Sequence, residues 1–221
     1  MPKLSIITVT LNDSKGLKKT IESVVSQTFT DYEYIVIDGG STDGSVEIIK
    51  QYAEKITYWI SEPDKGVFQA MNKGIQRANG DYCLFMNSGD CIYSQNTLYN
   101  IFSKQKEYDV DFMVGSAIIV TSRNKKVRIK IPPLKITAKH LIAAPLCHQS
   151  TFIKTNILKL NPYDENLRIA ADWVHMFQEF VFGNASYLKL NEIVSTFDNG
   201  GISSTNLDLA RNERNIFLNE N

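Results

Sequence analysis

Three aspartates, Asp38, Asp64 and Asp90, each follow an apolar run that is typical of a buried β-strand. Strands of an α/β sheet end at a common edge, so the three carboxylates are expected to lie near one another. Clustered carboxylates repel one another unless a cation or a hydrogen-bond donor on a ligand compensates their charge. A helix or turn cap explains any one of them alone, but the three together favour a ligand site.

The loop that begins at Asp38, DGGSTDGS, is rich in glycine and lies between an expected strand and an expected helix. It matches neither the GxGxxG fingerprint nor a Walker loop, because no Lys-Ser/Thr pair follows its glycines. Dinucleotide and P-loop functions are therefore weak alternatives. The loop indicates a tight turn and a helix cap, together with a ligand role for Asp38.

These residues are positioned by alternating strand-like and helix-like segments, the pattern of an α/β fold in which helices flank a mostly parallel central sheet. Strands are expected at residues 4–9, 32–38, 56–61, 82–86, 112–120, 148–154 and 186–197. Helices are expected at residues 15–26, 66–78, 96–105, 170–182 and 207–218, with one more starting within 41–45. The basic segment 123–130 is expected to form a hairpin with the strand at 112–120.

Composition restricts the function classes. The chain has 221 residues and a formal net charge of zero, so no overall basic field is present to bind nucleic acid. No apolar stretch is long enough to span a bilayer, and the N-terminus lacks a signal-peptide pattern, which predicts a cytoplasmic protein. The three cysteines have no CxxC spacing and indicate neither a disulfide framework nor a zinc site.

Several linked motifs resemble the family 2 glycosyltransferases of GT-A fold, bacterial inverting enzymes that use nucleotide-diphosphate sugars. The resemblance is carried by LSIITVTLND, SVVSQTFTDYEYIVIDGGSTDGS and SEPDKGVFQAMNKGIQRANGDYCLFMNSGD, and it extends more loosely to about residue 200. The last motif looks especially like the branch found in exopolysaccharide, colanic-acid-type and O-antigen clusters. The resemblance implies one GT-A domain over residues 1–221, with a nucleotide-sugar-binding half at 1–95 and an acceptor-side half at 96–221.

In that family the fourth strand ends in an acidic motif that holds a divalent cation against the donor diphosphate. The corresponding residues are Asn87, Ser88, Gly89 and Asp90. The resemblance therefore implies Mg²⁺ or Mn²⁺ at Asp90, with fewer charged ligands than usual because Asn87 replaces the first carboxylate. A simple turn would explain Gly89 but not the neighbouring acid.

The same resemblance assigns the nucleoside side of the site. The residues it implies there are Thr8, Asn12, Asp38, Asp64, Lys65 and Asn72. Asp38 would accept a hydrogen bond from the base or ribose, and Lys65 would offset the charge of the diphosphate.

The acceptor side is assigned to Asp172, which the resemblance implies is the catalytic base at the start of a helix. The alternative is a carboxylate placed there by the helix macrodipole. His148 precedes an expected strand in PLCHQSTFIK. It is either a metal or diphosphate ligand or a structural histidine.

The expected function is transfer of a sugar, as a hexosyl or N-acetylhexosaminyl group, from a nucleotide-sugar donor to a glycan or lipid-linked oligosaccharide acceptor. A non-catalytic nucleotide- or carbohydrate-binding relative remains the alternative. A sugar nucleotidyltransferase is not favoured, because the first strand of this chain is not followed by the glycine-rich, basic loop expected of such an enzyme. The five basic residues of 123–130 leave two explanations open, a solvated hairpin and a peripheral contact with the inner face of the membrane. A homodimer is likewise left open.

Overall fold

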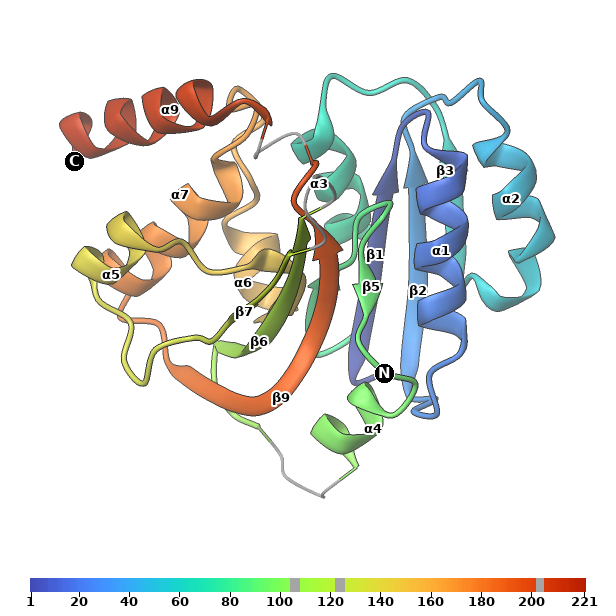
Figure 1. Ribbon diagram of the computed structural model, residues 1–221, viewed down its shortest axis with the longest axis horizontal. Helices are drawn as coiled ribbons and strands as arrows, with labels where there is room; N and C mark the ends of the chain where they lie inside the picture. Colours follow the sequence, from blue (N-terminus) through green and yellow to red (C-terminus); the bar gives the residue numbers. More distant parts are fainter. Residues whose placement is uncertain (104–107, 122–125, 202–204) are drawn as a thin grey trace.

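The computed structural model describes residues 1–103, 108–121, 126–201 and 205–221. Nine strands form one sheet in the order β3-β2-β1-β4-β8-β6-β9-β5, and β7 pairs with β6 outside this path. Figure 1 shows this sheet at the centre of the molecule with helices on both of its faces. The α/β class expected from the sequence is confirmed.

The first half of the chain builds parallel β-loop-α units. Its strands are β1 (Leu4–Thr10), β2 (Tyr32–Asp38), β3 (Tyr58–Ser61) and β4 (Tyr82–Phe85). The helices between them are α1 (Ser14–Val25), α2 (Ser45–Gln51), a short 3₁₀ turn η1 (Ala53–Lys55) and α3 (Val67–Arg77). Strand β1 pairs in parallel with both β2 and β4, so their carboxyl ends meet at one edge.

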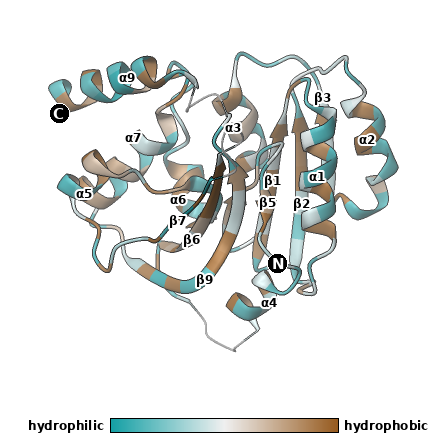
Figure 2. Cartoon of the chain, in the orientation of Figure 1, coloured by the Kyte–Doolittle hydropathy of each residue, from teal (hydrophilic) through white to brown (hydrophobic). Residues whose placement is uncertain are grey.

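Alternate side chains of these strands bury against opposite helix layers, as the two-residue period of a strand requires. Ile6 packs in the cluster that contains Leu17 of α1, whereas Ile7 packs in the cluster that contains Met71 of α3. In Figure 2 brown gathers on the central strands, and teal is prominent on α1 and α2. Because helices cover both faces of the sheet here, all seven residues of β1 are buried.

The chain from residue 91 onward adds antiparallel pairs to the sheet, of which the sequence predicted the hairpin of β6 and β7. The strands of this part are β5 (Cys91–Ile92), β6 (Phe112–Thr121), β7 (Lys126–Lys130), β8 (Thr151–Lys154) and β9 (Tyr187–Asp198). Strand β8 lies antiparallel between β4 and β6, and β9 runs parallel to β6 with a bulge near Ser116. The expected hairpin of β6 and β7 is present, although Arg123 and the rest of 122–125 lie outside the described residues.

The remaining helices lie beside this half of the sheet. They are α4 (Thr97–Phe102), α5 (Ala138–Ala143), the 3₁₀ turn η2 (His148–Ser150), α6 (Thr155–Leu160), α7 (Ala171–Phe177), the π-helical turn η3 (Gln178–Phe182) and α9 (Leu207–Glu220). The expected helix at 96–105 is shorter within the described residues, and residues 104–105 lie outside them. Among the helices of the described ranges, none combines the length and the apolar character needed to cross a membrane.

Candidate functional site

The loop after β4 turns sharply at Gly89 and buries Asp90. The backbone N–H of Ser88 donates to the Val9 carbonyl at 3.1 Å, which carries the chain along β1 beyond the end of β4. Gly89 has φ +93°, a left-handed conformation that favours glycine. The turn closes where the Asp90 N–H donates to the Asn87 carbonyl at 2.9 Å.

Helix α1 holds this loop through Asp13 and Thr20. The Ser88 hydroxyl donates to Asp13 Oδ2 at 2.6 Å, and the Thr20 hydroxyl donates to the Asp90 carbonyl at 2.7 Å. Asp13 also caps α1 by accepting from the Gly16 N–H. Neither Asp13 nor Thr20 was identified from the sequence, because both contacts are made with a loop about 70 residues away along the chain.

Asp90 is a buried carboxyl group, with 9% of the residue exposed. Burial raises its pKa to about 6, against the opposing effects of His148, Gln149 and Lys19. Burial disfavours the ionised form of Asp90, and a positive charge placed beside the carboxylate would stabilise that form. Asp90 is therefore suited to bind a cation.

His148 connects the Asp90 loop with helix α7. Its Nδ1 lies 2.9 Å from Asp172 Oδ2, and its Nε2 lies 3.4 Å from Asn87 Nδ2. Asn87 Oδ1 is buried and, among the described residues, has no hydrogen-bond partner. Residues 87, 148 and 172 come from three different elements, so the structure brings together side chains that the sequence placed separately.

The histidine and the aspartate form a charge-assisted pair. Burial alone would lower the pKa of His148, but the hydrogen bond and charge of Asp172 outweigh it and raise that pKa. Burial alone would raise the pKa of Asp172, but the hydrogen bond and charge of His148, the Trp173 N–H and the charge of Arg214 together outweigh it and lower that pKa. Asp172 is therefore held as a carboxylate, with Oδ1 accepting from the Trp173 N–H at 2.7 Å.

Glu213 of α9 fixes the segment that leads into α7. Its carboxylate accepts the backbone N–H groups of three consecutive residues, Arg168, Ile169 and Ala170, at 2.8, 3.0 and 2.9 Å. These groups precede the helix that carries Asp172, so Glu213 positions the start of that helix. The sequence gave no signal for Glu213, since nothing local distinguishes it from a solvated residue of an amphipathic helix.

Asp38 is fully buried and serves the glycine loop. Its carboxylate accepts from the backbone N–H groups of Gly40 and Ser41 at 3.2 and 2.9 Å. It also accepts from the hydroxyls of Ser41 and Ser61. The carboxylate therefore shapes the end of β2, and any contact with a nucleoside would have to compete with four internal donors.

Asn12 and Asp64 border the same loop. Asn12 Oδ1 accepts from the Thr42 N–H at 2.9 Å. A Cβ added at Gly39 would lie 2.5 Å from Asp64 Oδ2, so the aspartate packs directly against the glycine loop. Lys65 is exposed beside it. The structure thus gathers these three predicted residues at the ends of β1, β2 and β3.

Thr8 and Asn72 occupy structural positions away from this surface. The fully buried Thr8 hydroxyl donates to the Met86 carbonyl at 2.7 Å, which ties β1 to the chain after β4. Asn72 exchanges two hydrogen bonds with the backbone of Tyr163, at 2.8 and 3.0 Å. Both side chains form internal hydrogen bonds, so a nucleotide contact by either one would have to compete with these bonds.

The residues around Asp90 suit a divalent cation in their chemistry. A carboxylate, the unpartnered Asn87 amide oxygen and an imidazole are all ligands that Mn²⁺ accepts, and the first two suit Mg²⁺. Within the described ranges, however, no three His, Cys, Asp or Glu side chains group closely enough to hold a metal ion by themselves. Oxygens of a bound diphosphate would therefore have to complete the coordination.

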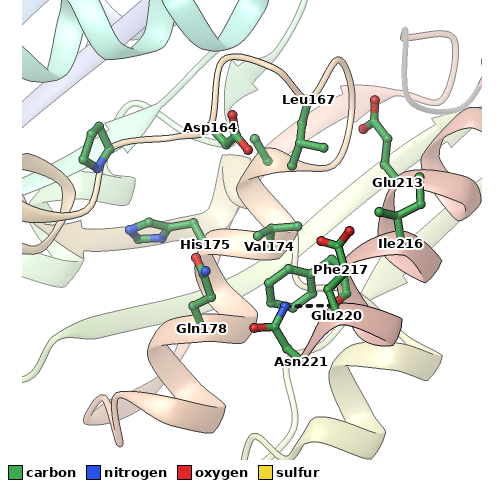
Figure 3. A pocket seen from close by; sticks show the side chains of 12 residues that line it. Asp164, Leu167, Val174, His175, Gln178, Glu213, Ile216, Phe217, Glu220 and Asn221 are labelled. Atoms are coloured by element: carbon green, nitrogen blue, oxygen red, sulfur yellow. Dashed lines mark hydrogen bonds between the residues drawn. The ribbon is translucent and has the colours of Figure 1, made fainter.

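A separate cavity of about 240 Å³ lies between α7 and α9. Figure 3 shows Val174, Ile216 and Phe217 in this cavity, with His175 at its margin. None of the predicted site residues lines it. Burial lowers the pKa of His175 to about 4, which keeps its ring neutral. This cavity belongs to the packing of α9 and is not the candidate site.

Comparison with known proteins identifies the family of the chain. The family model described as "Glycosyl transferase family 2" matches residues 5–166. A "PGL/p-HBAD biosynthesis glycosyltransferase" of Mycobacterium bovis is 29% identical over 214 residues, covering 94% of this chain and 81% of the relative.

Two solved structures share the fold. S. aureus TarS 1-349 in complex with UDP-GlcNAc superposes with a TM-score of 0.73 at 22% identity over 92% of this chain. The mannosyltransferase PcManGT from Pyrobaculum calidifontis, in complex with GDP-Man and Mn²⁺, has a TM-score of 0.66 at 14% identity over 95% of this chain. The chain spans 61% of the length of each. The fold is that of the GT-A glycosyltransferases, and the chain belongs to glycosyl transferase family 2.

Proposed function

We propose that the protein is an inverting glycosyltransferase that moves a sugar from a nucleotide-diphosphate donor, a UDP-sugar, to a polysaccharide or lipid-linked oligosaccharide. The observation that carries the proposal is the contact of His148 with Asn87 on one side and Asp172 on the other. This contact joins the loop suited to the diphosphate with the carboxylate suited to the acceptor. Residues 1–221 act as one GT-A domain in this proposal.

The donor end of the site comprises the Asn87–Asp90 loop and the glycine loop. Asp90, the Asn87 amide oxygen and His148 would hold Mg²⁺ or Mn²⁺, and the cation would supply positive charge to the leaving diphosphate. Ser88 and Gly89 set the shape of this loop, and the Asn12, Asp38, Asp64 and Lys65 group lies toward the nucleoside. The complexes of TarS with UDP-GlcNAc and of PcManGT with GDP-Man and Mn²⁺ support a nucleotide-sugar donor and a metal.

At the acceptor end, Asp172 is the general base. Its carboxylate takes the proton of the acceptor hydroxyl while that oxygen forms a bond to the anomeric carbon. The bond from the anomeric carbon to the diphosphate oxygen breaks, and the diphosphate leaves with the electron pair. Attack from the face opposite the leaving group inverts the anomeric centre.

Nucleotide-sugar hydrolysis in the presence of Mn²⁺ tests this function. The purified chain should release nucleoside diphosphate from one or a few members of a panel of UDP- and GDP-sugars, and Asp90→Asn should abolish the release. Binding of a nucleotide sugar with no release and no transfer to any glycan would favour a non-catalytic relative instead.

A further inference from the structure

Positive charge is concentrated in the segment that precedes the candidate site. No Asp or Glu occurs between Asp111 and Asp164, although the whole chain has equal numbers of acidic and basic residues. Within 126–142 the basic residues are Lys126, Arg128, Lys130, Lys135 and Lys139. Lys130 is used internally, because its ammonium group donates to the Pro145 carbonyl. The other four are exposed.

The same segment exposes large apolar side chains. Val127, Ile129, Ile131, Leu134 and Ile142 are 61%, 57%, 63%, 83% and 52% exposed. Within the described sheet, β7 pairs only with β6, and Figure 1 shows its yellow-green connection to α5 running along the outside of the molecule. Because successive side chains of a strand alternate between its two faces, Val127 and Ile129 lie on one face of β7, and Lys126 and Arg128 lie on the other. The four exposed basic residues and the five apolar residues of this segment are called the basic-apolar surface below. A segment that is apolar on one face and basic on the other is typical of a chain that lies in a membrane interface.

The basic-apolar surface is fastened to the framework of the site. The Tyr187 hydroxyl donates to the Pro133 carbonyl at 2.8 Å, which holds the connection against β9. The Trp173 indole N–H donates to the Leu141 carbonyl at 2.9 Å, which holds α5 against the helix that carries Asp172. A partner bound to this surface would therefore lie at a fixed orientation to the acceptor end of the site.

We propose that the basic-apolar surface docks on a bilayer that contains anionic lipid. Four cations complement the negative surface of such a bilayer, and the apolar side chains can enter its headgroup boundary. A second copy of this chain fits less well, because a symmetric contact would place like charges against one another. Resting on the proposed function, this inference identifies the acceptor as lipid-linked, presented at the membrane surface to Asp172.

Vesicle sedimentation tests the proposal with the full chain. Wild-type protein should bind phosphatidylcholine vesicles that contain phosphatidylglycerol and should bind vesicles of phosphatidylcholine alone more weakly. A basic residue near the surface contributes about 1 kcal/mol, or about fivefold in affinity. Arg128→Gln with Lys139→Gln should therefore weaken binding about 25-fold, and Ile131→Ser with Leu134→Ser should weaken it by at least about tenfold.

Matched controls come from exposed residues elsewhere. Lys50→Gln with Lys55→Gln, and Leu160→Ser, should bind vesicles like wild type. All variants should keep the folded-state spectrum and the vesicle-free rate of donor hydrolysis, so loss of docking is separated from failure of the proposed chemistry. Equal binding by surface and control variants, no binding by wild type, or a dimer that Leu134→Ser dissociates without any vesicle binding would each overturn the proposal.

Discussion

At the scale of single residues, His148 contacts both the Asn87–Asp90 loop and helix α7. Its two ring nitrogens face a side chain of the donor loop and the carboxylate of Asp172. A carboxylate that binds one nitrogen of a histidine fixes the tautomer and the orientation of the ring. In the proposed function, one imidazole thus connects the donor and acceptor ends of the site.

Asp172→Asn should slow sugar transfer by about a hundredfold to ten-thousandfold, the usual loss when a general base is removed. The amide oxygen can still accept from the Trp173 N–H, so the fold should stay close to wild type, and any loss of donor affinity through the altered contact with His148 should be much smaller than the loss of rate. Initial rates at saturating acceptor, together with calorimetric titration of the nucleoside diphosphate, measure the two effects separately. Asp208→Asn, at an exposed carboxylate, is the control. Turnover near the wild-type rate would remove Asp172 from the role of base.

His175 should make stability depend on pH in a defined direction. Its folded-state pKa is about 4, whereas the unfolded residue titrates near 6.5, so the unfolded chain binds an extra proton between these values. The unfolding free energy should therefore fall as pH drops from about 6.5 to about 4, by about 3 kcal/mol in total. The difference between wild type and His175→Gln in urea unfolding across this range isolates the effect. A difference that does not change with pH would contradict it.

At the scale of elements, α9 stabilises the position of α7. Glu213 accepts three backbone N–H groups ahead of α7, and the Arg214 guanidinium lies 5.3 Å from the Trp173 ring centre. Helix α9, which follows α7 in the chain, thus sets where α7 begins.

Glu213→Gln should destabilise the protein by about 1.5–3 kcal/mol, because an amide presents one acceptor where the carboxylate presents two charged ones. Glu220→Gln, at an exposed site on the same helix, is the matched control and should leave stability close to wild type. Urea unfolding measures both variants. Equal midpoints for the two would show that the buried carboxylate does not hold the start of α7.

The order of the elements was largely predictable, but their pairing was not. Short runs rich in apolar and β-branched residues, without polar alternation, located β1, β2 and β4, because both faces of these strands are buried by helices. The position of β8 between β4 and β6 depends on contacts such as Leu84 with Phe152, which no local pattern encodes. The Asp172–His148 contact has the same origin, since both residues were identified separately and only the packing of α7 brings them together.

At the scale of the whole molecule, the residues of the proposed site come from three parts of the chain. The ends of β1 and β2 carry the glycine loop, the end of β4 carries Asp90, and the second half supplies Asp172 and the basic-apolar surface. The family-model match ends at residue 166, so α7 and α9 lie beyond it. The alignment with the Mycobacterium bovis glycosyltransferase covers 94% of this chain, so it extends past that point.

The most direct test of the central claim is calorimetric titration of UDP into the protein with Mn²⁺ present. Wild type should bind UDP, and a chelator should weaken that binding, because Asp90 and its neighbours hold the cation against the diphosphate. Asp90→Asn should lose the metal-dependent part of the affinity, whereas Asp208→Asn should retain it. Metal-dependent UDP affinity in Asp90→Asn equal to that of wild type would contradict the assignment of the donor site to the end of β4.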